Sequence, residues 1–375
     1  MKIIEISLQD RSNQKAFINF PFDLYKDNPL WVPPIKSDLR KIFKPNYPFY
    51  QYGEAVFLLA VSDQRKVLGR LAVANNHRYN QFHKSKTAFF YYFEVVDDLH
   101  VAEALFFHGF EWAKRQGLNK ILGPKGLTVL DGFGMLIKGF EYRPAFGQPY
   151  NPPYYPEMID TLGFSKVTDA FSGFIDQNTE VPEKISKAAK IVKKKMRFEI
   201  PLLKTKADLR KVVKDFQRLY NESLAASAGN PPVTDEDMDN MVSQLMWIAD
   251  PRLIKLIYKD GKAVGWLLVY PDVGAALQRI NGRLFPFGWL QILLESKRTH
   301  WVNMNGVGII EEYQRLGGTA LLYDEFHKSV LESEQYNYAE MLQIREENIN
   351  SLLEVANVGS NFHKTHRLYE RQLAD

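Results

Sequence analysis

One stretch of this 375-residue sequence decides how the rest is interpreted: Val307-Gly308-Ile309-Ile310-Glu311-Glu312-Tyr313-Gln314-Arg315-Leu316-Gly317-Gly318-Thr319-Ala320-Leu321-Leu322. It predicts a strand that ends in a tight glycine-rich turn, from which a helix begins. Backbone N–H groups at such a helix start converge, and the helix dipole adds partial positive charge, so the turn suits a phosphate group. Paired glycines let the backbone approach an anion closely, and Arg315 adds a formal charge. A glycine-rich connection without a ligand is the alternative that this stretch alone leaves open.

Around this turn, the second half of the chain predicts an ordered series of elements. Asp260-Gly261 is a strong signal for the turn of a hairpin. The series runs as follows: a strand at Arg197–Leu203, helices at Lys206–Leu224 and Asp235–Ile248, a hairpin of Leu253–Tyr258 and Ala263–Tyr270, a long strand at Trp301–Ile310, a helix at Gly318–Glu334, a strand at Tyr338–Ile344, a helix at Asn348–Val358 and a last strand at His363–Glu370.

The first half predicts a similar series with little sequence identity to the second. Asp98 is expected to cap its main helix, and Gly117 to end it. The elements are strands at Ala55–Val61, Val67–Ala74 and Thr87–Val96, a helix at Leu99–Gln116, a strand at Lys120–Leu122, a helix ending at Leu162-Gly163-Phe164 and a strand at Lys166–Ile175. The sequence therefore predicts an α/β protein, with two mixed units in tandem.

The turn resembles the pyrophosphate-binding loop of the GNAT superfamily of N-acetyltransferases, written Gln/Arg-x-x-Gly-x-Gly/Ala. Arg315–Ala320 fits this pattern, and Gln314–Thr319 fits it one residue earlier except that Thr319 stands where Gly or Ala is expected. Tyr313 favours the earlier register, because such loops often follow an acidic residue and a Tyr. The element order of residues 197–371 is also that of the family. Nearly the whole chain resembles a group of tandem bacterial GNAT proteins, through residues 28–34, 150–156 and 280–289.

The resemblance implies an acyl-CoA co-substrate, most simply acetyl-CoA, bound by the second half with no metal. In the family, the pantetheine arm lies between two splayed strands, which here correspond to Trp301–Ile310 and Tyr338–Ile344. The expected binding residues are Ile309, Gln314, Arg315, Gly317, Gly318, Thr319, Ala320 and Asn348.

The same resemblance divides the chain into a domain at 1–178, a basic linker or helix at 179–196, and an acyl-CoA-binding domain at 197–375. The first domain lacks the phosphate loop, because Val96-Asp97-Asp98-Leu99-His100 stands in its place. Two carboxylates at a helix start suit capping and the helix dipole, but they repel a pyrophosphate. We therefore expect the first half not to bind CoA in the family's manner, and instead to cover or extend the acceptor side of the cleft.

Acid–base residues are less clear from the sequence. Where some family members have a Glu base on the long strand, this chain has Asn303, with Asn305 on the same strand face. Val355 takes the place of the Tyr that often serves as acid. Glu94, on the long strand of the first half, is a second candidate, since burial among aromatic residues raises a carboxyl pKa. A hydrogen-bonded or exposed strand residue is the alternative for Glu94.

Three hypotheses follow for the function. The first is an N-acyltransferase, most simply one that transfers an acetyl group, that acts on a small-molecule or peptide amine. The second is a protein that binds acyl-CoA without transferring the acyl group, because Asn303 and Val355 lack acid–base chemistry. The third is an aminoacyltransferase of the peptide-bridge type, whose only support is the basic stretch Lys184–Arg197. A solvated helix face is the alternative for that stretch.

Composition limits the other classes. There is no cysteine, which excludes disulfides and thiolate chemistry, and the charges nearly balance at 48 basic and 44 acidic residues. The amino-terminal residues lack an apolar segment of signal-peptide length, and no apolar run is long enough to span a bilayer, so we expect a cytoplasmic protein without a membrane partner. The apolar insertion Asp272–His300 is either a flap over the acceptor or a packing subdomain.

Overall fold

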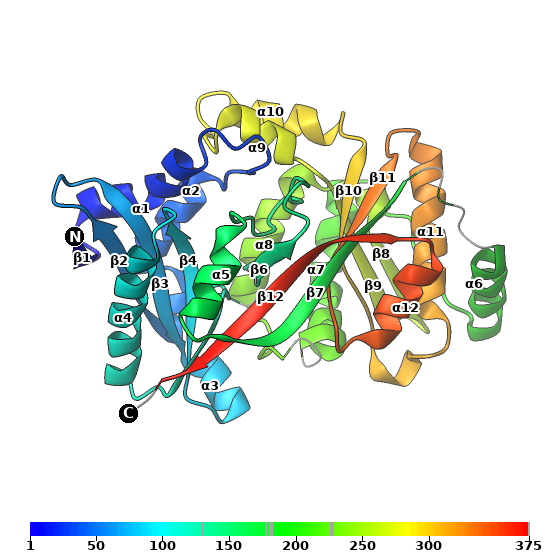
Figure 1. The fold of residues 1–375 in the computed structure, drawn as a ribbon. Coiled ribbons are helices and arrows are strands. Elements are labelled where there is room, and N and C mark those ends of the chain that lie inside the picture. The colour runs from blue at the N-terminus through cyan, green and yellow to red at the C-terminus, as the bar shows by residue number, and fades with distance from the viewer. Residues whose placement is uncertain (129–130, 177–178, 180–182, 226–228, 374–375) are drawn as a thin grey trace. The chain divides into compact units, whose positions relative to one another are not determined.

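Two units of mixed α/β structure, each with its own core, make up the computed structural model (Figure 1). The structure describes residues 1–128, 131–176, 179, 183–225 and 229–373. Unit 1 comprises Met1–Ala170, Leu277–Gly288 and Lys364–Asp375, and unit 2 comprises Phe171–Ala276 and Trp289–His363. Compared with the predicted division at 178 and 197, each unit also takes a piece of chain from the other half.

Unit 1 is built on strands in the order β1-β2-β3-β4-β5-β12, and β6 also pairs with β12. Its elements are β1 (Lys2–Glu5), α1 (Arg11–Leu24), α2 (Lys36–Leu39), β2 (Gly53–Val61), β3 (Val67–Asn76), α3 (His77–His83), β4 (Thr87–Val95), α4 (Leu99–Arg115), β5 (Lys120–Gly123), β6 (Met135–Lys138) and α5 (Tyr154–Thr161), with short 3-10 turns at Arg40–Phe43 and Pro48–Gln51. The carboxyl-terminal part of β12 (Asn361–Gln372) pairs with β5, which places residues 364–375 in this unit.

Strands β2, β3 and β4 and one amphipathic helix form a large part of the core of unit 1. β2, β3 and β4 form an antiparallel meander whose inner residues include Leu71, Val73 and Phe90, none of them exposed. Helix α4 covers this face, and Gly109 permits the approach, because a Cβ there would lie 2.8 Å from Val73. As predicted, Asp98 caps α4: its side chain accepts a hydrogen bond from the His100 N–H.

Unit 2 contains strands in the order β7-β11-β10-β9-β8. Its elements are the end of β7 (Ser165–Asp176), α6 (Glu183–Met196), α7 (Lys206–Tyr220), a π-helical turn (Asn221–Ala225), α8 (Asp235–Ile248), a 3-10 turn (Pro251–Leu253), β8 (Lys255–Lys259), β9 (Lys262–Pro271), β10 (Trp301–Ile309), a 3-10 turn (Glu311–Tyr313), α11 (Gly318–Ser333), β11 (Tyr338–Arg345) and α12 (Ile349–Asn357). Helices α9 (Gly274–Ile280) and α10 (Gly288–Ser296) lie on the stretches where the chain passes between units.

Local sequence signals fix most of unit 2. Asp260 and Gly261 take the positive φ angles, 50° and 78°, that the β8–β9 hairpin turn requires. Thr205 and Thr234 start α7 and α8 with capping boxes. The strand predicted at Arg197–Leu203 is wrong: in this stretch only Glu199 makes a β-bridge, to Tyr258, and Pro201 has no N–H to donate to a ladder.

Candidate functional site

The central parallel strands of unit 2 separate along their length. Trp301–Met304 of β10 pair with Tyr338–Met341 of β11, and beyond these residues no pairing continues. A bulge between Met304 and Val307 marks the start of the divergence on β10, and Gln343 takes a positive φ of 47° on β11. Apart from the first residue of each strand, the paired residues are buried, whereas Asn305–Val307 and Leu342–Arg345 are exposed or half-buried. Water therefore reaches both strands where they diverge.

The glycine-rich turn follows the carboxyl end of β10. Gln314 holds the turn to the strand, because its side-chain amide donates to the Ile309 carbonyl at 3.1 Å. Arg315 and Gly317 adopt positive φ angles of 60° and 84°, and α11 begins at Gly318 without a side-chain cap. Gln314, Arg315 and Leu316 are exposed, whereas Gly318 is buried.

Six successive amides in this turn have no acceptor within the described part of the chain. They belong to Arg315, Leu316, Gly317, Gly318, Thr319 and Ala320; the first internal bond of the helix runs from the Leu321 N–H to the Gly317 carbonyl. Unsatisfied amides at a helix start attract an anion, and no carboxylate caps this helix. The arrangement can therefore bind a phosphate or a similar anion.

The basic stretch of the sequence forms α6, which packs beside this turn. Val192 comes so close that a Cβ on Gly317 would lie 2.6 Å from its methyl group. Lys193 forms an ion pair with Glu325 of α11 at 3.0 Å. Lys194 and Lys195 are exposed, and neither has an ion pair among the residues that the structure describes. The positive charge of this helix thus lies beside the anion-attracting amides.

The π-helical turn after α7 approaches β10 where the strands diverge. A Cβ on Gly308 would lie 2.2 Å from the Ser223 hydroxyl, which also accepts a hydrogen bond from the Trp266 indole at 3.0 Å. Gly308 is therefore required for this close approach. Arg345, at the end of β11, lies near Gly229 of the connection to α8. Residues 226–228 of that connection are outside the described part.

A buried polar cluster lies where β10 and β11 are still paired. Asn303, 1% exposed, donates from its side-chain amide to Asp272 at 3.0 Å. Its neighbour across the ladder is Glu340, whose carboxylate lies 3.7 Å from the imidazole Nε2 of His363. Burial raises the pKa of Tyr270, and the nearby carboxylates of Asp272 and Glu340 raise it further. We call Tyr270, Asp272, Asn303, Glu340 and His363 the carboxylate–histidine cluster.

The sequence pattern did not indicate that Asp272, Glu340 and His363 belong to the site. A signal was present for Glu340, because this acidic residue stands between apolar residues of a strand that was expected to be buried. For His363 the sequence offers no comparable signal. Its proximity to Glu340 depends on the tertiary arrangement of two strands that are not consecutive in sequence.

The other predicted residues occupy more local roles. Asn348 caps α12, where its side chain accepts a hydrogen bond from the Ser351 N–H at 3.3 Å. Val355, on the same helix, is buried. Thr319 and Ala320 form the first turn of α11.

Glu94 lies in unit 1, where it forms an ion pair with Arg70. The Arg70 Nε donates to its carboxylate at 2.6 Å, and the guanidinium also donates to the Phe17 carbonyl and stacks on the Phe17 and Tyr92 rings. Arg70 is only 2% exposed, so Glu94 neutralises a buried charge. This arrangement favours the structural interpretation of Glu94.

The matching strands of unit 1, β4 and β5, also pair briefly and then diverge. Thr87–Phe89 pair with Lys120–Leu122, after which the Lys125 N–H donates to the Phe90 carbonyl. At the end of β4, the Tyr155 hydroxyl contacts both the N–H and the carbonyl of Val95, at 2.6 and 3.1 Å, and Tyr154 donates to the same carbonyl at 2.8 Å. The backbone N–H and carbonyl at the end of β4 are therefore already hydrogen-bonded to side chains of this unit.

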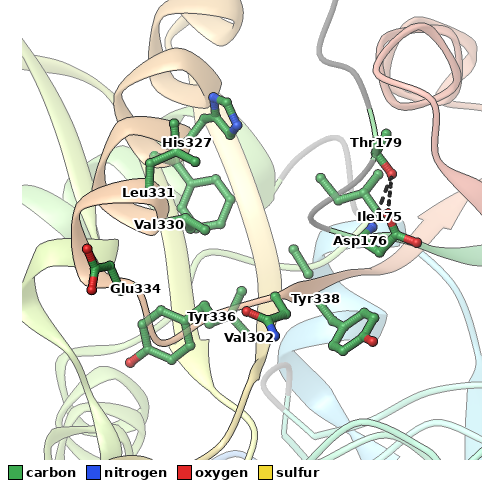
Figure 2. A pocket seen from close by; sticks show the side chains of 13 residues that line it. Ile175, Asp176, Thr179, Val302, His327, Val330, Leu331, Glu334, Tyr336 and Tyr338 are labelled. Carbon is green, nitrogen blue, oxygen red and sulfur yellow. Dashed lines mark hydrogen bonds between the residues drawn. The ribbon is translucent and has the colours of Figure 1, made fainter.

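A cavity of about 210 Å³ lies elsewhere in unit 2. Figure 2 shows the α11 side chains His327, Val330 and Leu331 on one side of it and Ile175 and Thr179 on the other. Val302 and Tyr338 also line it, at the amino ends of β10 and β11. This is the opposite end of the strands from the glycine-rich turn, so the cavity is not part of the candidate site.

Two features, a metal-holding cluster and a membrane-spanning helix, are absent from the described residues. These residues contain no group of three or more His, Asp or Glu side chains placed to hold a metal ion. No helix among them is both long enough and apolar enough to cross a membrane.

Comparisons with known proteins agree with this architecture. No family model matches the chain. Among curated proteins, it is 27% identical to Protein YghO of Escherichia coli over 97% of this chain and 94% of that protein. It is 24% identical to a bacterial ceramide synthase of Caulobacter vibrioides over 98% and 97% of the two chains.

Solved structures extend the likeness to the fold. A tandem GNAT protein from the clavulanic acid biosynthesis pathway aligns over 100% of this chain and 99% of its own, with 11% identity and a TM-score of 0.58. A GCN5-related N-acetyltransferase from Sphaerobacter thermophilus aligns over 100% and 96%, with 12% identity and a TM-score of 0.51. The predicted α/β class and tandem arrangement are confirmed, and the chain has a GNAT-like tandem fold.

Proposed function

We propose that this protein is an acyl-CoA-dependent N-acyltransferase, with the acyl-CoA held by unit 2. The observation that carries the proposal is the run of amides from Arg315 to Ala320, which lack acceptors at the start of α11. A diphosphate supplies acceptors for several such amides at once. The acyl arm would then extend along the solvent-accessible edges of β10 and β11.

The charges around the turn support the same ligand. Arg315 lies in the turn, and Lys194 and Lys195 lie on the helix that packs beside it; all three are exposed and form no ion pair with carboxylates of the described chain. CoA carries a further phosphate beside its diphosphate, so several cations are useful. This explanation of the basic stretch requires no nucleic acid, and the aminoacyltransferase function stays the alternative that tRNA binding at low salt would support.

Chemistry requires an amine nitrogen to attack the thioester carbonyl as the carbon–sulfur bond breaks. The nitrogen must lose a proton, and the CoA sulfur must gain one. We assign the proton-accepting role to Glu340 with His363, because they lie beside Asn303, one residue before the strands diverge. Asn303, held by Asp272, would orient the acyl carbonyl or a water molecule rather than act as a base.

The acceptor is an amine, and a long-chain amine deserves testing first. The Caulobacter relative, which matches nearly the whole chain, is named a ceramide synthase, and a ceramide is a long-chain amine joined to an acyl group. A panel should therefore contain long-chain amino alcohols, short polyamines and peptide amines. Acyl-CoA donors should range from acetyl to long-chain species.

Ligand-dependent thermal unfolding tests the binding step. An acyl-CoA at about 100 times its Kd should stabilise unit 2 by roughly 2.7 kcal/mol, a shift of several degrees at most. Arg315→Glu should reduce this shift. Arg65→Glu is a matched control, because Arg65 is also exposed and also has a positive φ, 62°, in a turn of unit 1. The absence of any shift with acetyl-CoA and long-chain acyl-CoAs would refute the proposal.

Release of free CoA thiol then separates a transferase from a protein that only binds acyl-CoA. Asn303 and Val355, in place of acid–base residues, favour the second function. A thermal shift without thiol release across the whole amine panel would establish it. Thiol release that depends on an amine would establish transfer.

A further inference from the structure

The segment between α9 and α10 exposes apolar side chains in succession. Phe285 and Phe287 are 80% and 71% exposed, and Trp289, Leu290 and Leu294 are 38%, 42% and 37% exposed. We call these five residues the apolar segment; Figure 1 labels the two helices that bracket its start. Large apolar side chains exposed singly are ordinary, whereas five within ten residues need an explanation.

The backbone around this segment is firmly held. In unit 1, the Gln278 side chain donates to the Pro29 and Trp31 carbonyls, and the Lys36 N–H donates to the Gly282 carbonyl. The loop closes tightly, because a Cβ on Gly288 would lie 1.9 Å from the Arg283 carbonyl. The phenylalanines are therefore presented outward from an anchored loop.

Helix α10 is two-faced. Ile292 is buried, whereas Leu290 and Leu294, four residues apart, share an exposed face with Trp289 on its border. Lys297 and Arg298 follow directly and are exposed. An exposed apolar face that ends in basic residues is the pattern of a helix lying in a membrane interface.

Basic residues flank the segment at both of its ends. From Gly274 to His300 there are four Lys or Arg residues and a single acidic residue, Glu295. In unit 1, burial lowers the pKa of Lys36, and the positive charges of Arg283 and Arg40 lower it further against the opposite effect of Asp23. In unit 2, burial lowers the pKa of Lys206, with contributions from Lys297 and Arg210. Arg283 and Lys297 thus each belong to a cationic group.

We propose that the apolar segment attaches this protein to the surface of a membrane that contains anionic lipids. In unit 1, Phe285 and Phe287 would enter the boundary between headgroups and acyl chains, and Arg283 would contact lipid phosphates. In unit 2, Trp289 would make the same apolar contact, and Lys297 and Arg298 the same polar one. A symmetric dimer through the same face would bring like charges together, which disfavours a second copy as the occupant. Surface attachment needs no spanning helix, so it is compatible with the absence of one from the described residues.

Vesicle flotation with the full chain tests this proposal. Wild-type protein should float with vesicles of phosphatidylcholine and phosphatidylglycerol, and much less with phosphatidylcholine alone. Phe285→Ser with Phe287→Ser should lower the partition coefficient by about tenfold or more. Arg283→Glu with Lys297→Glu should remove the preference for anionic vesicles and reduce the salt dependence.

Phe107→Ser is the matched control, because Phe107 is a 62% exposed phenylalanine on α4 outside the segment; it should float like wild type. All variants should retain the wild-type thermal unfolding and any acyl-CoA-induced shift, so the result is independent of the proposed function. Failure of the wild type to float with anionic vesicles would overturn the proposal. The proposal would also be overturned if the serine substitutions left flotation unchanged. It would equally be overturned if they converted a wild-type dimer to a monomer without a change in flotation.

Discussion

Each unit contains a pair of parallel strands that diverge, but the two units differ in what the backbone beside these strands bonds to. In unit 1, Tyr154 and Tyr155 occupy the end of β4, and Asp98 caps the helix that follows. In unit 2, no side chain caps α11, and the preceding amides lack acceptors in the described chain. The two units thus differ at a few positions around a helix start, where side chains bond to the backbone in unit 1 and the amides lack acceptors in the described part of unit 2.

The comparison is tested most severely by removing one strand acid from each unit. Glu340→Gln should reduce kcat by about 10²–10⁴-fold, the usual contribution of a general base. Glu94→Gln should leave kcat within a few-fold of wild type, but should lower the free energy of unfolding by about 3 kcal/mol, since Arg70 loses its buried partner. Steady-state thiol release and urea unfolding measure the two effects.

The opposite pattern, with kcat lost in Glu94→Gln and retained in Glu340→Gln, would move catalysis to unit 1. His363→Asn sharpens the assignment. It should lower kcat and alter the pH profile while leaving the acyl-CoA-induced thermal shift intact, which a merely structural role would not predict.

His366 provides a pH test, three residues along β12 from His363. Burial lowers the pKa of His366 to about 4; the Pro149 carbonyl opposes this shift, and Lys364 adds to it. The unfolded chain, with a His pKa near 6.5, binds the proton first as the pH falls. Stability from neutral His366 is therefore complete above about pH 6.5 and is lost progressively towards pH 4, by about 3 kcal/mol in all.

Urea unfolding of the wild type across this pH range should show the loss, and His366→Asn should flatten that part of the curve. The exposed His108→Asn variant is the control. An unchanged slope in the His366 variant would show that other groups govern acid stability in unit 1.

Tyr155→Phe tests whether the chain itself closes the strands of unit 1. The Val95 N–H would lose its partner at 2.6 Å in a buried setting, so the free energy of unfolding should fall by about 2 kcal/mol. Tyr154→Phe should cost less, because the Val95 carbonyl keeps its contact with Tyr155. Equal small losses in thermal unfolding would mean that neither hydroxyl matters there.

The smallest expected effect compares two glycines with positive φ in unit 2. Alanine costs about 1–2 kcal/mol at either Gly261 or Gly317 through the left-handed backbone alone. Gly261 has open space around it, whereas a Cβ on Gly317 would also press against Val192. Gly317→Ala should therefore destabilise unit 2 more, and only this variant should weaken the acyl-CoA-induced shift.

Local signals accounted for much of this structure before it was known. The bounds of α8, the start of α11 at Gly318 and the cap of α4 followed from turn and capping residues. Helix α1 was missed because Pro21 stands inside it and Gly or Pro signals do not delimit it. The strand expected at residues 197–203 is reduced to a single bridge, and Pro201, which cannot donate to a ladder, was a local signal against it.

The candidate site also has one part that local sequence indicated and one part that it did not. The glycine-rich turn is local, so its sequence indicated it. Glu340 and His363 meet only through strand order, and the ion pair of Glu94 with Arg70 depends on the register of β3 against β4. Pairings of this kind are long-range properties of the sheet, and a single sequence does not specify them.

The crossing of β12 into unit 1 determines how the halves must be dissected. Tyr369–Gln372 satisfy the edge of β5, so a fragment that stops near residue 178 would leave that edge unpaired and prone to intermolecular association. A soluble amino-terminal half would need the last twelve residues supplied as a peptide or grafted by circular permutation. Removal of residues from the carboxyl end is therefore expected to destabilise unit 1, which is built mainly from the amino-terminal half of the chain.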